Sequence, residues 1–241
     1  MISRRSLLSV PALALPGPDQ PAGRTLKVVC TGGHPDDPES GCGGTLVRYA
    51  AAGHKVTIIY LTRGERGIAG TGLDDAARIR TTEAQAACRI IGAKPVFAGQ
   101  IDGATELNKR TLDAFSALLS AERPDVVFTQ WPVDTHMDHQ VASTLTVQSC
   151  FRLRSPYLLF FYEVNAGEQT RGFHPSDYID ITAVQDKKKA ALFSHKSQNG
   201  EEIYRRHHGP MQSFRGREVG VTAAEAFVHL SGDSSVTSLF G

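Results

Sequence analysis

Residues 31–44, which read TGGHPDDPESGCGG, constrain the fold more than any other part of the chain. The apolar run 26–30 before them has the length of a strand, and residues 45–52 after them predict a helix that ends at Gly53. A strand that passes through a glycine-flanked turn into a helix is typical of the ligand-binding edge of an open α/β sheet. Because the turn holds an imidazole and two carboxylates, it indicates metal or acid–base chemistry.

A dinucleotide site is the rival interpretation of this glycine-rich turn. It is disfavoured, because no G-x-G-x-x-G sequence opens the helix. The aspartates at positions 36 and 37 would also repel a pyrophosphate group.

The rest of the chain repeats the alternation of strand and helix. Apolar and β-branched runs predict strands at 54–62, 95–98, 125–130, 157–164 and 177–181, and helical periodicity predicts helices at 75–91, 109–121, 139–151 and 183–195. Strands that are apolar on both faces and separated by helices indicate an α/β fold with a mainly parallel sheet covered by helices.

Three further segments carry expectations. The aromatic run 157–162 is expected in the core, with sugar stacking by one tyrosine as the alternative. The lysines at 187–189 are expected on a solvated helix face. The polar segment 198–214 is either a flexible flap or part of a partner contact.

Composition limits the classes of protein to consider. A length of 241 residues with 41% hydrophobic residues suits one α/β domain with a sizeable core. No apolar run approaches the ~18 residues needed to cross a bilayer, and a net charge of +1 argues against a nucleic-acid binder. The four cysteines are scattered without a C-x-x-C pair, so we expect buried free thiols, with a disulfide as the alternative.

The first 23 residues resemble a targeting segment. Arg4 and Arg5 form a twin-arginine pair, the apolar run 7–15 follows, and Ala12 and Ala14 offer an A-x-A-type cleavage site. One interpretation is export by the twin-arginine route to the periplasm or the exterior. The alternative is a disordered tail on a cytoplasmic protein, because the apolar run is short. In either case we expect residues 24–241 to form a single domain.

Two loops carry the candidate chemistry. His34 and Asp37 follow the first strand, and His136 and His139 follow the predicted strand 125–130 with the same spacing. Because the carboxyl ends of parallel strands share one edge, both loops can converge there. Two histidines and one aspartate leave a coordination position for water, which is the pattern of a catalytic zinc site. Asp36, beside a ligand but directed elsewhere, is then the candidate general base.

Simpler interpretations exist for each residue. A single histidine or aspartate in a loop is usually a surface group, and Asp36 or Asp37 can cap the following helix. The same residues could also form an acid–base site without metal, but no nucleophile accompanies them. Ser40 lies outside any G-x-S-x-G sequence, and Cys42 has no neighbouring base in the sequence.

These motifs resemble a known family. Residues 33–37 and 41–45 match the H-P-D-D-x-x-x-G-x-G-G-T signature of the PIG-L/LmbE-like N-deacetylases, and further stretches match in order at 61–65, 80–83, 136–139, 180–182, 195–198 and 224–227. The resemblance covers nearly the whole chain after residue 26. It implies a Rossmann-like three-layer α/β/α fold and zinc-dependent removal of an N-acyl group, usually acetyl, from an amino sugar.

Position by position, the resemblance also implies roles. His34, Asp37 and His139 would bind zinc, and Asp36 would be the general base. A protonated His136 would stabilise the tetrahedral oxyanion and could protonate the leaving amine.

The resemblance extends less directly to substrate contacts and has two departures. Arg80 and Asp102 lie where the family places groups that hold sugar hydroxyls. Pro38 and Met137 replace residues common in the family, glutamate and proline, and neither position supplies a metal ligand in this scheme.

The predicted function is therefore a metal-dependent hydrolase that removes the N-acetyl group of an N-acetylglucosamine-type sugar or glycoside by attack of a zinc-bound water. The alternatives are a metal-dependent amidase or esterase with a non-sugar substrate, and a protein that only binds carbohydrate. Ferrous iron is an alternative to zinc, because two histidines and a carboxylate hold both metals. The expected partner is a small-molecule amino sugar, with no nucleic acid and no transmembrane segment. Self-association into a homo-oligomer stays open.

Overall fold

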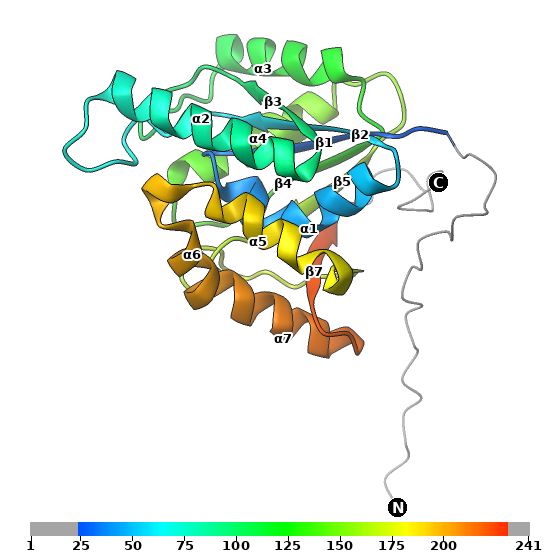
Figure 1. Cartoon of the computed structure of the whole chain (residues 1–241). Coiled ribbons are helices and arrows are strands. Elements are labelled where there is room, and N and C mark those ends of the chain that lie inside the picture. The colour runs from blue at the N-terminus through cyan, green and yellow to red at the C-terminus, as the bar shows by residue number, and fades with distance from the viewer. Residues whose placement is uncertain (1–23, 231–241) are drawn as a thin grey trace, which may run out of the picture.

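Seven strands form a mixed sheet in the computed structural model, which describes residues 24–230 (Figure 1). Their order is β3-β2-β1-β4-β5-β7-β6. The five parallel strands are β1 (Lys27–Gly32), β2 (Lys55–Tyr60), β3 (Ala93–Phe97), β4 (Val126–Gln130) and β5 (Leu158–Tyr162). β7 (Ala224–His229) runs antiparallel to both β5 and β6 (Asp177–Asp180). The predicted α/β fold with a mainly parallel sheet is confirmed.

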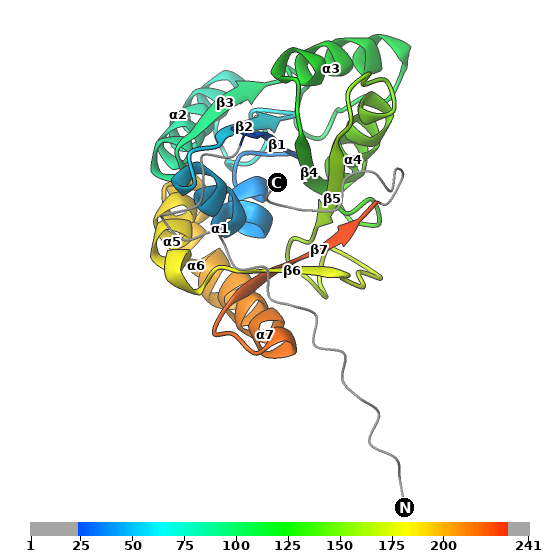
Figure 2. The ribbon, with the colours of Figure 1, turned by 90° about the vertical axis from the view of Figure 1, so that its right-hand side faces the viewer.

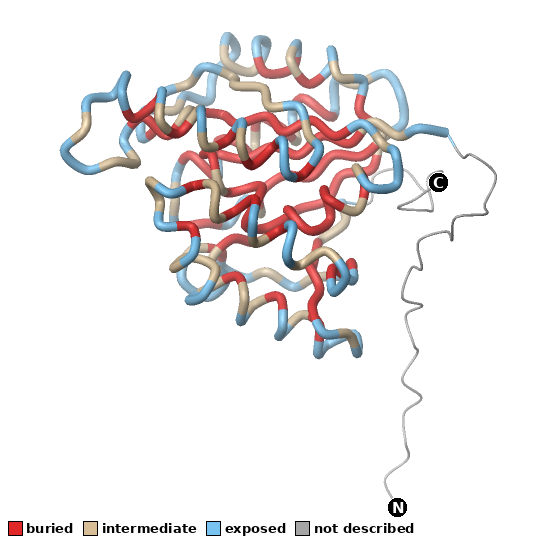
Figure 3. Tube along the Cα trace, viewed as in Figure 1, coloured by how far each residue is buried: buried red, intermediate tan, exposed pale blue. Residues whose placement is uncertain are grey.

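Helices cover both faces of the sheet (Figure 2). One face carries α1 (Asp37–Ala51), α2 (Leu73–Ile91) and α5 (Gln185–Phe193), and the other carries α3 (Lys109–Glu122) and α4 (Met137–Cys150). Short 3-10 turns at Thr182–Val184 and Lys196–Gln198 flank α5. Successive strand residues point to opposite faces, so Val28 and Cys30 enter one core and Val29 the other. Figure 3 shows the resulting concentration of buried residues in the sheet.

The order of the strands fixes where a ligand can bind. β1 lies between β2 and β4, and the helices that follow β1 and β4 lie on opposite faces of the sheet. The chain therefore leaves these two neighbouring strands in opposite directions, which opens a crevice at their carboxyl ends.

α1 begins at Asp37, eight residues before the predicted start at Thr45. Its glycine-rich first half permits close packing rather than a turn. A Cβ on Gly41 would lie 2.3 Å from the ring of Tyr162, and one on Gly44 would lie 2.7 Å from Ile181. Packing against these side chains outweighs the low helix propensity of glycine.

The segment 198–214 is mostly helical, and the flexible-flap interpretation stays a prediction. It contains α6 (Gly200–Ile203), a π-helical turn (Tyr204–His208) and the first half of α7 (Gly209–Val219). α7 packs on β7, a strand that the sequence analysis did not predict. The partner-contact interpretation stays a prediction.

Lys188 is fully buried, so the solvated-face prediction is wrong for this lysine. Its Nζ donates to Glu225 Oε1 at 2.6 Å. Glu225 also accepts hydrogen bonds from the backbone N–H groups of Gly44 and Thr45, at 2.8 and 2.7 Å. The buried pair thus joins α5, β7 and α1, which provides the partners that a buried charge requires.

Three expectations that concern the whole chain are the state of the cysteines, the membrane-spanning segments and the N-terminal targeting pattern. Cys30, Cys42, Cys88 and Cys150 are all buried and free, as predicted. Within residues 24–230, no helix has both the length and the apolar character needed to cross a membrane. The twin-arginine pattern of residues 1–23 lies outside the described residues.

Candidate metal centre

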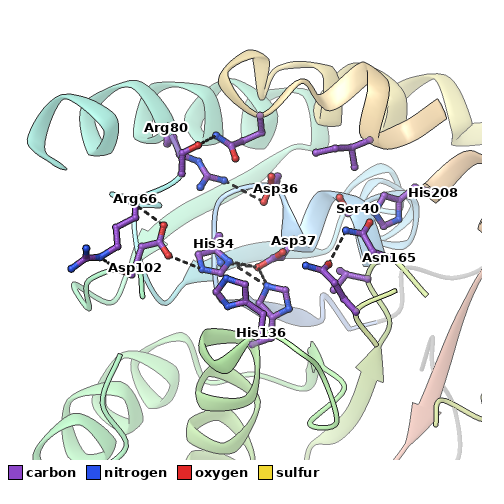
Figure 4. Close-up of a pocket in the computed structure, with 16 residues that line it drawn as sticks. His34, Asp36, Asp37, Ser40, Arg66, Arg80, Asp102, His136, Asn165 and His208 are labelled. Carbon is purple, nitrogen blue, oxygen red and sulfur yellow. Dashed lines mark hydrogen bonds and ion pairs between the residues drawn. The ribbon is translucent and has the colours of Figure 1, made fainter. Parts of the chain in front are cut away.

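Three side chains from the two predicted loops place their donor atoms close together (Figure 4). Asp37 Oδ2 lies 3.2 Å from His34 Nδ1 and 3.3 Å from His139 Nε2. The two ring nitrogens lie 3.3 Å apart. Ligands of a tetrahedral zinc, each about 2.0–2.1 Å from the metal, are about 3.3–3.4 Å from one another. The donor set therefore fits a small divalent metal.

The outer nitrogen of each imidazole faces a further carboxylate. His34 Nε2 lies 3.0 Å from Asp138 Oδ2 and 3.2 Å from Asp102 Oδ1. His139 Nδ1 lies 3.1 Å from Asp134 Oδ1, an ion-pair distance, although the geometry of this contact does not make a hydrogen bond. Metal-binding histidines usually have such a partner, which fixes the tautomer and orients the ring. Both rings thus present their inner nitrogen toward Asp37.

The charges of the donor set are mutually stabilised. Burial opposes the ionised form of Asp37, but His139 and His34 lower the pKa of its carboxyl well below the usual value. Burial likewise opposes the charged form of His139, but Asp37 and Asp134 raise the pKa of the ring to about 9. The neighbouring imidazoles therefore keep Asp37 ionised, which is the form in which a carboxylate binds a metal.

Asp36 lies beside the donor set but points toward a different group. Its backbone has φ 110°, an uncommon conformation for a residue other than glycine. Its amide donates to Glu39 Oε2 at 3.2 Å, and Arg80 Nη2 lies 3.4 Å from its Oδ1. Burial raises the pKa of the Asp36 carboxyl to about 6, against the lowering effect of Arg80. A carboxylate of this kind suits a general base at neutral pH.

His136 is half-buried at the start of α4 and stacks on the ring of His139, with 4.8 Å between centroids. Its Nδ1 accepts a hydrogen bond from the Asp138 backbone N–H at 3.3 Å, so the ring carries its proton on Nε2. Burial and the neighbouring imidazoles lower the pKa of His136. The ring can therefore act as an N–H donor through Nε2, and the protonated state expected of His136 during the reaction stays a prediction.

A pocket of about 400 Å³ opens over these groups. Figure 4 shows Arg66 and Asp102 at one end, His34 and Asp37 in the middle, and Ser40, Asn165 and His208 at the other end. The other lining residues are Asp36, Gly67, Arg80, His136, Val164, Gln169, Gln198 and Ile203.

Comparison with known proteins identifies the family. The sequence profile of PIG-L, described as GlcNAc-PI de-N-acetylase, matches residues 29–150, which is half of the chain. The chain belongs to the PIG-L family. The resemblance seen in the sequence motifs is thereby confirmed.

Relatives of this PIG-L family member differ in activity. A diacetylchitobiose deacetylase of Thermococcus kodakarensis is 29% identical over 203 residues, covering 77% of this chain and 75% of the relative. A 4-oxalmesaconate hydratase of Pseudomonas putida is 26% identical over 217 residues, covering 80% and 83%. Among solved structures, a conserved protein of Thermus thermophilus has 32% identity and a TM-score of 0.70, covering 90% of this chain and 99% of the other.

The structure brings all seven predicted site residues of the PIG-L family member into one pocket. Arg80 is almost fully buried and also donates to the Pro35 carbonyl oxygen. Asp102 contacts His34 and accepts from the Arg66 backbone N–H at 3.1 Å. Contact of either residue with sugar hydroxyls stays a prediction.

Sequence reasoning missed two carboxylates, Asp134 and Asp138. Both lie in the loop that was singled out for His136 and His139, so their position was visible. Their role was not, because it depends on which ring nitrogen each carboxylate meets after the two loops converge.

Proposed function

We propose that this PIG-L family protein is a zinc-dependent hydrolase that removes the N-acetyl, or a related N-acyl, group from an N-acetylglucosamine-type amino sugar or its glycoside. The observation that carries the proposal is the triangle of His34, Asp37 and His139 donor atoms with the Asp36 carboxylate beside it. Two histidines and one carboxylate leave room for a reacting water, as in zinc hydrolases.

The roles of the residues follow from their positions. A divalent metal held by His34, Asp37 and His139 would polarise a carbonyl group and lower the pKa of water to about 7. Asp36 would accept the proton of the attacking water, because it is the pocket carboxylate whose pKa is raised toward neutrality. His136 would donate its Nε2–H to the developing oxyanion, where a preorganised donor lowers the barrier most effectively.

An amino-sugar substrate is supported by two observations. The relative from Thermococcus kodakarensis is a diacetylchitobiose deacetylase. Arg80, the buried cation of the pocket, is engaged by Asp36 and by the Pro35 carbonyl oxygen, which favours an uncharged substrate over an anionic one. The hydratase relative from Pseudomonas putida makes hydration of an unsaturated acid the competing activity to test.

A metal-dependent amidase or esterase with a non-sugar substrate would use the same donor set and the same base. The substitutions Arg80→Gln and Asp102→Asn separate the two. If these residues hold sugar hydroxyls, both changes should raise KM more for amino sugars than for simple amides or esters.

The decisive experiment measures acetate release from a panel of N-acetylglucosamine substrates. It compares the purified protein, the protein after chelation, and the chelated protein after addition of zinc or ferrous iron. Activity that disappears on chelation and returns with one metal would support the proposal and identify that metal. No acetate from any substrate, with bound metal verified, would contradict it and direct the search to other amides, esters or unsaturated acids.

Export by the twin-arginine route is a separate proposal, supported only by the residue pattern of positions 1–23. A reporter protein fused to these residues should appear outside the cytoplasm, and the Arg4→Lys/Arg5→Lys variant of the fusion should not. Retention of both fusions in the cytoplasm would contradict export.

A further inference from the structure

Three polar side chains gather at the end of the pocket away from Asp102: Ser40 of α1, Asn165 after β5, and His208 of the π-helical turn (Figure 4). They come from parts of the chain that are distant in sequence. None of the three has a role in the proposed hydrolysis.

His208 is the most unusual of the three. The residue is 1% exposed and lines the pocket. Its ring makes no hydrogen bond to any residue within 24–230, and the ring Nδ1 is buried without a partner. A buried polar group without a partner is costly, so such a group needs an explanation. The turn of five residues that carries it is a π-helix, an element that is rare and often found at functional sites.

Asn165 and Ser40 are also incompletely satisfied. Asn165 donates from Nδ2 to Gln169 Oε1 at 2.7 Å, but its Oδ1 is buried and has no partner within the described chain. Its φ of 42° is tolerated by asparagine better than by most residues. Ser40 is 5% exposed, and its hydroxyl forms no hydrogen bond to any residue that the structure describes.

We propose that Ser40, Asn165 and His208 form a subsite that binds an uncharged, hydroxyl-bearing group of the substrate. The proposal deepens the proposed hydrolase function and rests on it. The three side chains offer both donors and acceptors, which a hydroxyl group can pair with simultaneously. Val164 and Ile203 supply an apolar wall beside them, as ligand pockets usually combine the two kinds of surface.

The electrostatics favour an uncharged ligand. Burial, together with the nearby Lys188 and His207, lowers the pKa of His208 well below 6.5, so the ring stays neutral. Ser40 and Asn165 carry no charge either. A charged group would lose its hydration here without gaining a full countercharge from these side chains.

Two parts of a substrate could supply the hydroxyl group. With the scissile amide at the candidate metal ligands, one is the acyl group, if it is a hydroxyacyl group such as glycolyl. The other is a second sugar residue attached to the amino sugar. The chemistry at the subsite is the same, so paired substrates must distinguish the sources.

The test uses two pairs of substrates: N-glycolyl- against N-acetylglucosamine, and N,N'-diacetylchitobiose against N-acetylglucosamine. For each pair the ratio of kcat/KM values is compared between wild type and His208→Leu. Loss of one hydrogen bond should reduce the preference for the hydroxyl-bearing member about fivefold, mainly through KM. His208→Gln should restore part of the preference, because an amide can replace one ring nitrogen. The pair that responds identifies the source.

His207→Leu is the matched control, since His207 lies on the same turn but faces Glu168, 3.9 Å away. Asn165→Gly is a second test variant that removes the side chain, and glycine adopts φ 42° without strain. It should lower the same ratio that His208→Leu lowers, while His207→Leu should leave both ratios as in wild type.

Binding of the same saccharides is measured by calorimetry in addition to turnover. The two measurements separate the subsite proposal, which concerns binding, from the hydrolase proposal, which concerns turnover. Ratios of kcat/KM and Kd that are equal in wild type and in folded His208→Leu and Asn165→Gly would overturn the subsite. Absence of turnover with all substrates, but a Kd ratio that these variants reduce, would support the subsite and overturn the hydrolase function.

Discussion

Oδ2 of Asp138 lies 3.0 Å from Nε2 of His34, while Nδ1 of the same ring faces Asp37. The Asp138 carboxylate also accepts hydrogen bonds from the Gly103 backbone N–H and the Thr105 hydroxyl, at 2.7 and 2.6 Å. Three donors therefore fix Asp138, and Asp138 in turn fixes the proton of His34 on the side away from the candidate metal position.

Asp138→Asn should weaken metal binding about 10–100-fold, because the amide has one acceptor oxygen where the carboxylate has two. The affinity is measured by competition with a chromogenic chelator. Asp75→Asn, at an exposed carboxylate on α2, is the control and should bind metal as wild type does. Unchanged affinity in Asp138→Asn would show that the carboxylate does not orient the ligand.

Asp36 and Asp37 are neighbours in sequence with different predicted roles. Asp37→Asn should lose both metal and turnover. Asp36→Asn should keep the metal and lose about 10²–10⁴-fold in kcat, the usual contribution of a general base. The metal content of the purified variants tests the ligand role of Asp37, and their initial rates test the base role of Asp36. A fully active Asp36→Asn variant would require a different base.

The buried pair of Lys188 and Glu225 should contribute strongly to stability. Lys188→Met leaves a buried carboxylate without its countercharge and should lower the free energy of unfolding by about 3–5 kcal/mol. The double variant Lys188→Met/Glu225→Gln should recover part of this loss, because the charge is removed. Lys189→Met, at the partly exposed neighbour, should change stability by less than about 1 kcal/mol. Denaturant unfolding measures all three, and equal effects at 188 and 189 would contradict the role of burial.

His208 gives the folded state a specific dependence on pH. Its pKa is well below 6.5 in the folded protein because of burial and the nearby Lys188, and near 6.5 when unfolded. The unfolded chain therefore binds more protons below pH 6.5, so the contribution of this ring to stability is complete above pH 6.5 and is lost as pH falls below it.

His208→Gln should therefore show a smaller loss of stability on acidification than wild type. The difference can reach about 1.4 kcal/mol per pH unit, the limit for one proton. Denaturant unfolding of both proteins from about pH 5 to 8, with chelator present in all samples, gives the difference between their free energies of unfolding. The contributions of the other histidines are the same in both proteins and cancel in this difference. Parallel pH profiles would mean that the ring is accessible to protons in the folded state.

Two glycines of α1 should respond in opposite ways to the same substitution. Gly41→Ala would place a methyl group 2.3 Å from the Tyr162 ring and 2.7 Å from the Glu163 carbonyl oxygen, and should destabilise by about 1–3 kcal/mol. Gly43→Ala would meet only the Lys188 side chain, at 3.4 Å, and should stabilise by up to about 1 kcal/mol through helix propensity. Thermal unfolding measures both, and the same sign for the two variants would contradict the packing explanation.

The features that followed from local pattern were predicted well. Apolar runs predicted β1, β2, β4 and β5 correctly. Each of these strands is buried on both faces, so its sequence is a nearly continuous apolar run rather than an alternation of apolar and polar residues. The convergence of His34 with His139 followed from the rule that parallel strands end at one edge. All seven predicted site residues therefore line one pocket.

The features that depend on contacts between distant residues were not predicted. The glycine-rich start of α1 looks like a turn until Tyr162 and Ile181 are known to lie against it. Lys188 looks solvated until Glu225, 37 residues later, is placed beside it. The lowered pKa of His136 likewise depends on its burial and on the two neighbouring rings of His34 and His139.

β7 ends at His229 but pairs between β5 and β6, which precede it in the sequence. During translation, β5 and β6 are therefore synthesised before β7, the strand that pairs with both of them. Glu225, which holds the backbone of α1 at Gly44 and Thr45, arrives with β7. A nascent chain can thus pair β1 to β5 early, but the helix that follows the first candidate metal ligand acquires this anchor only when translation of the described residues is almost complete.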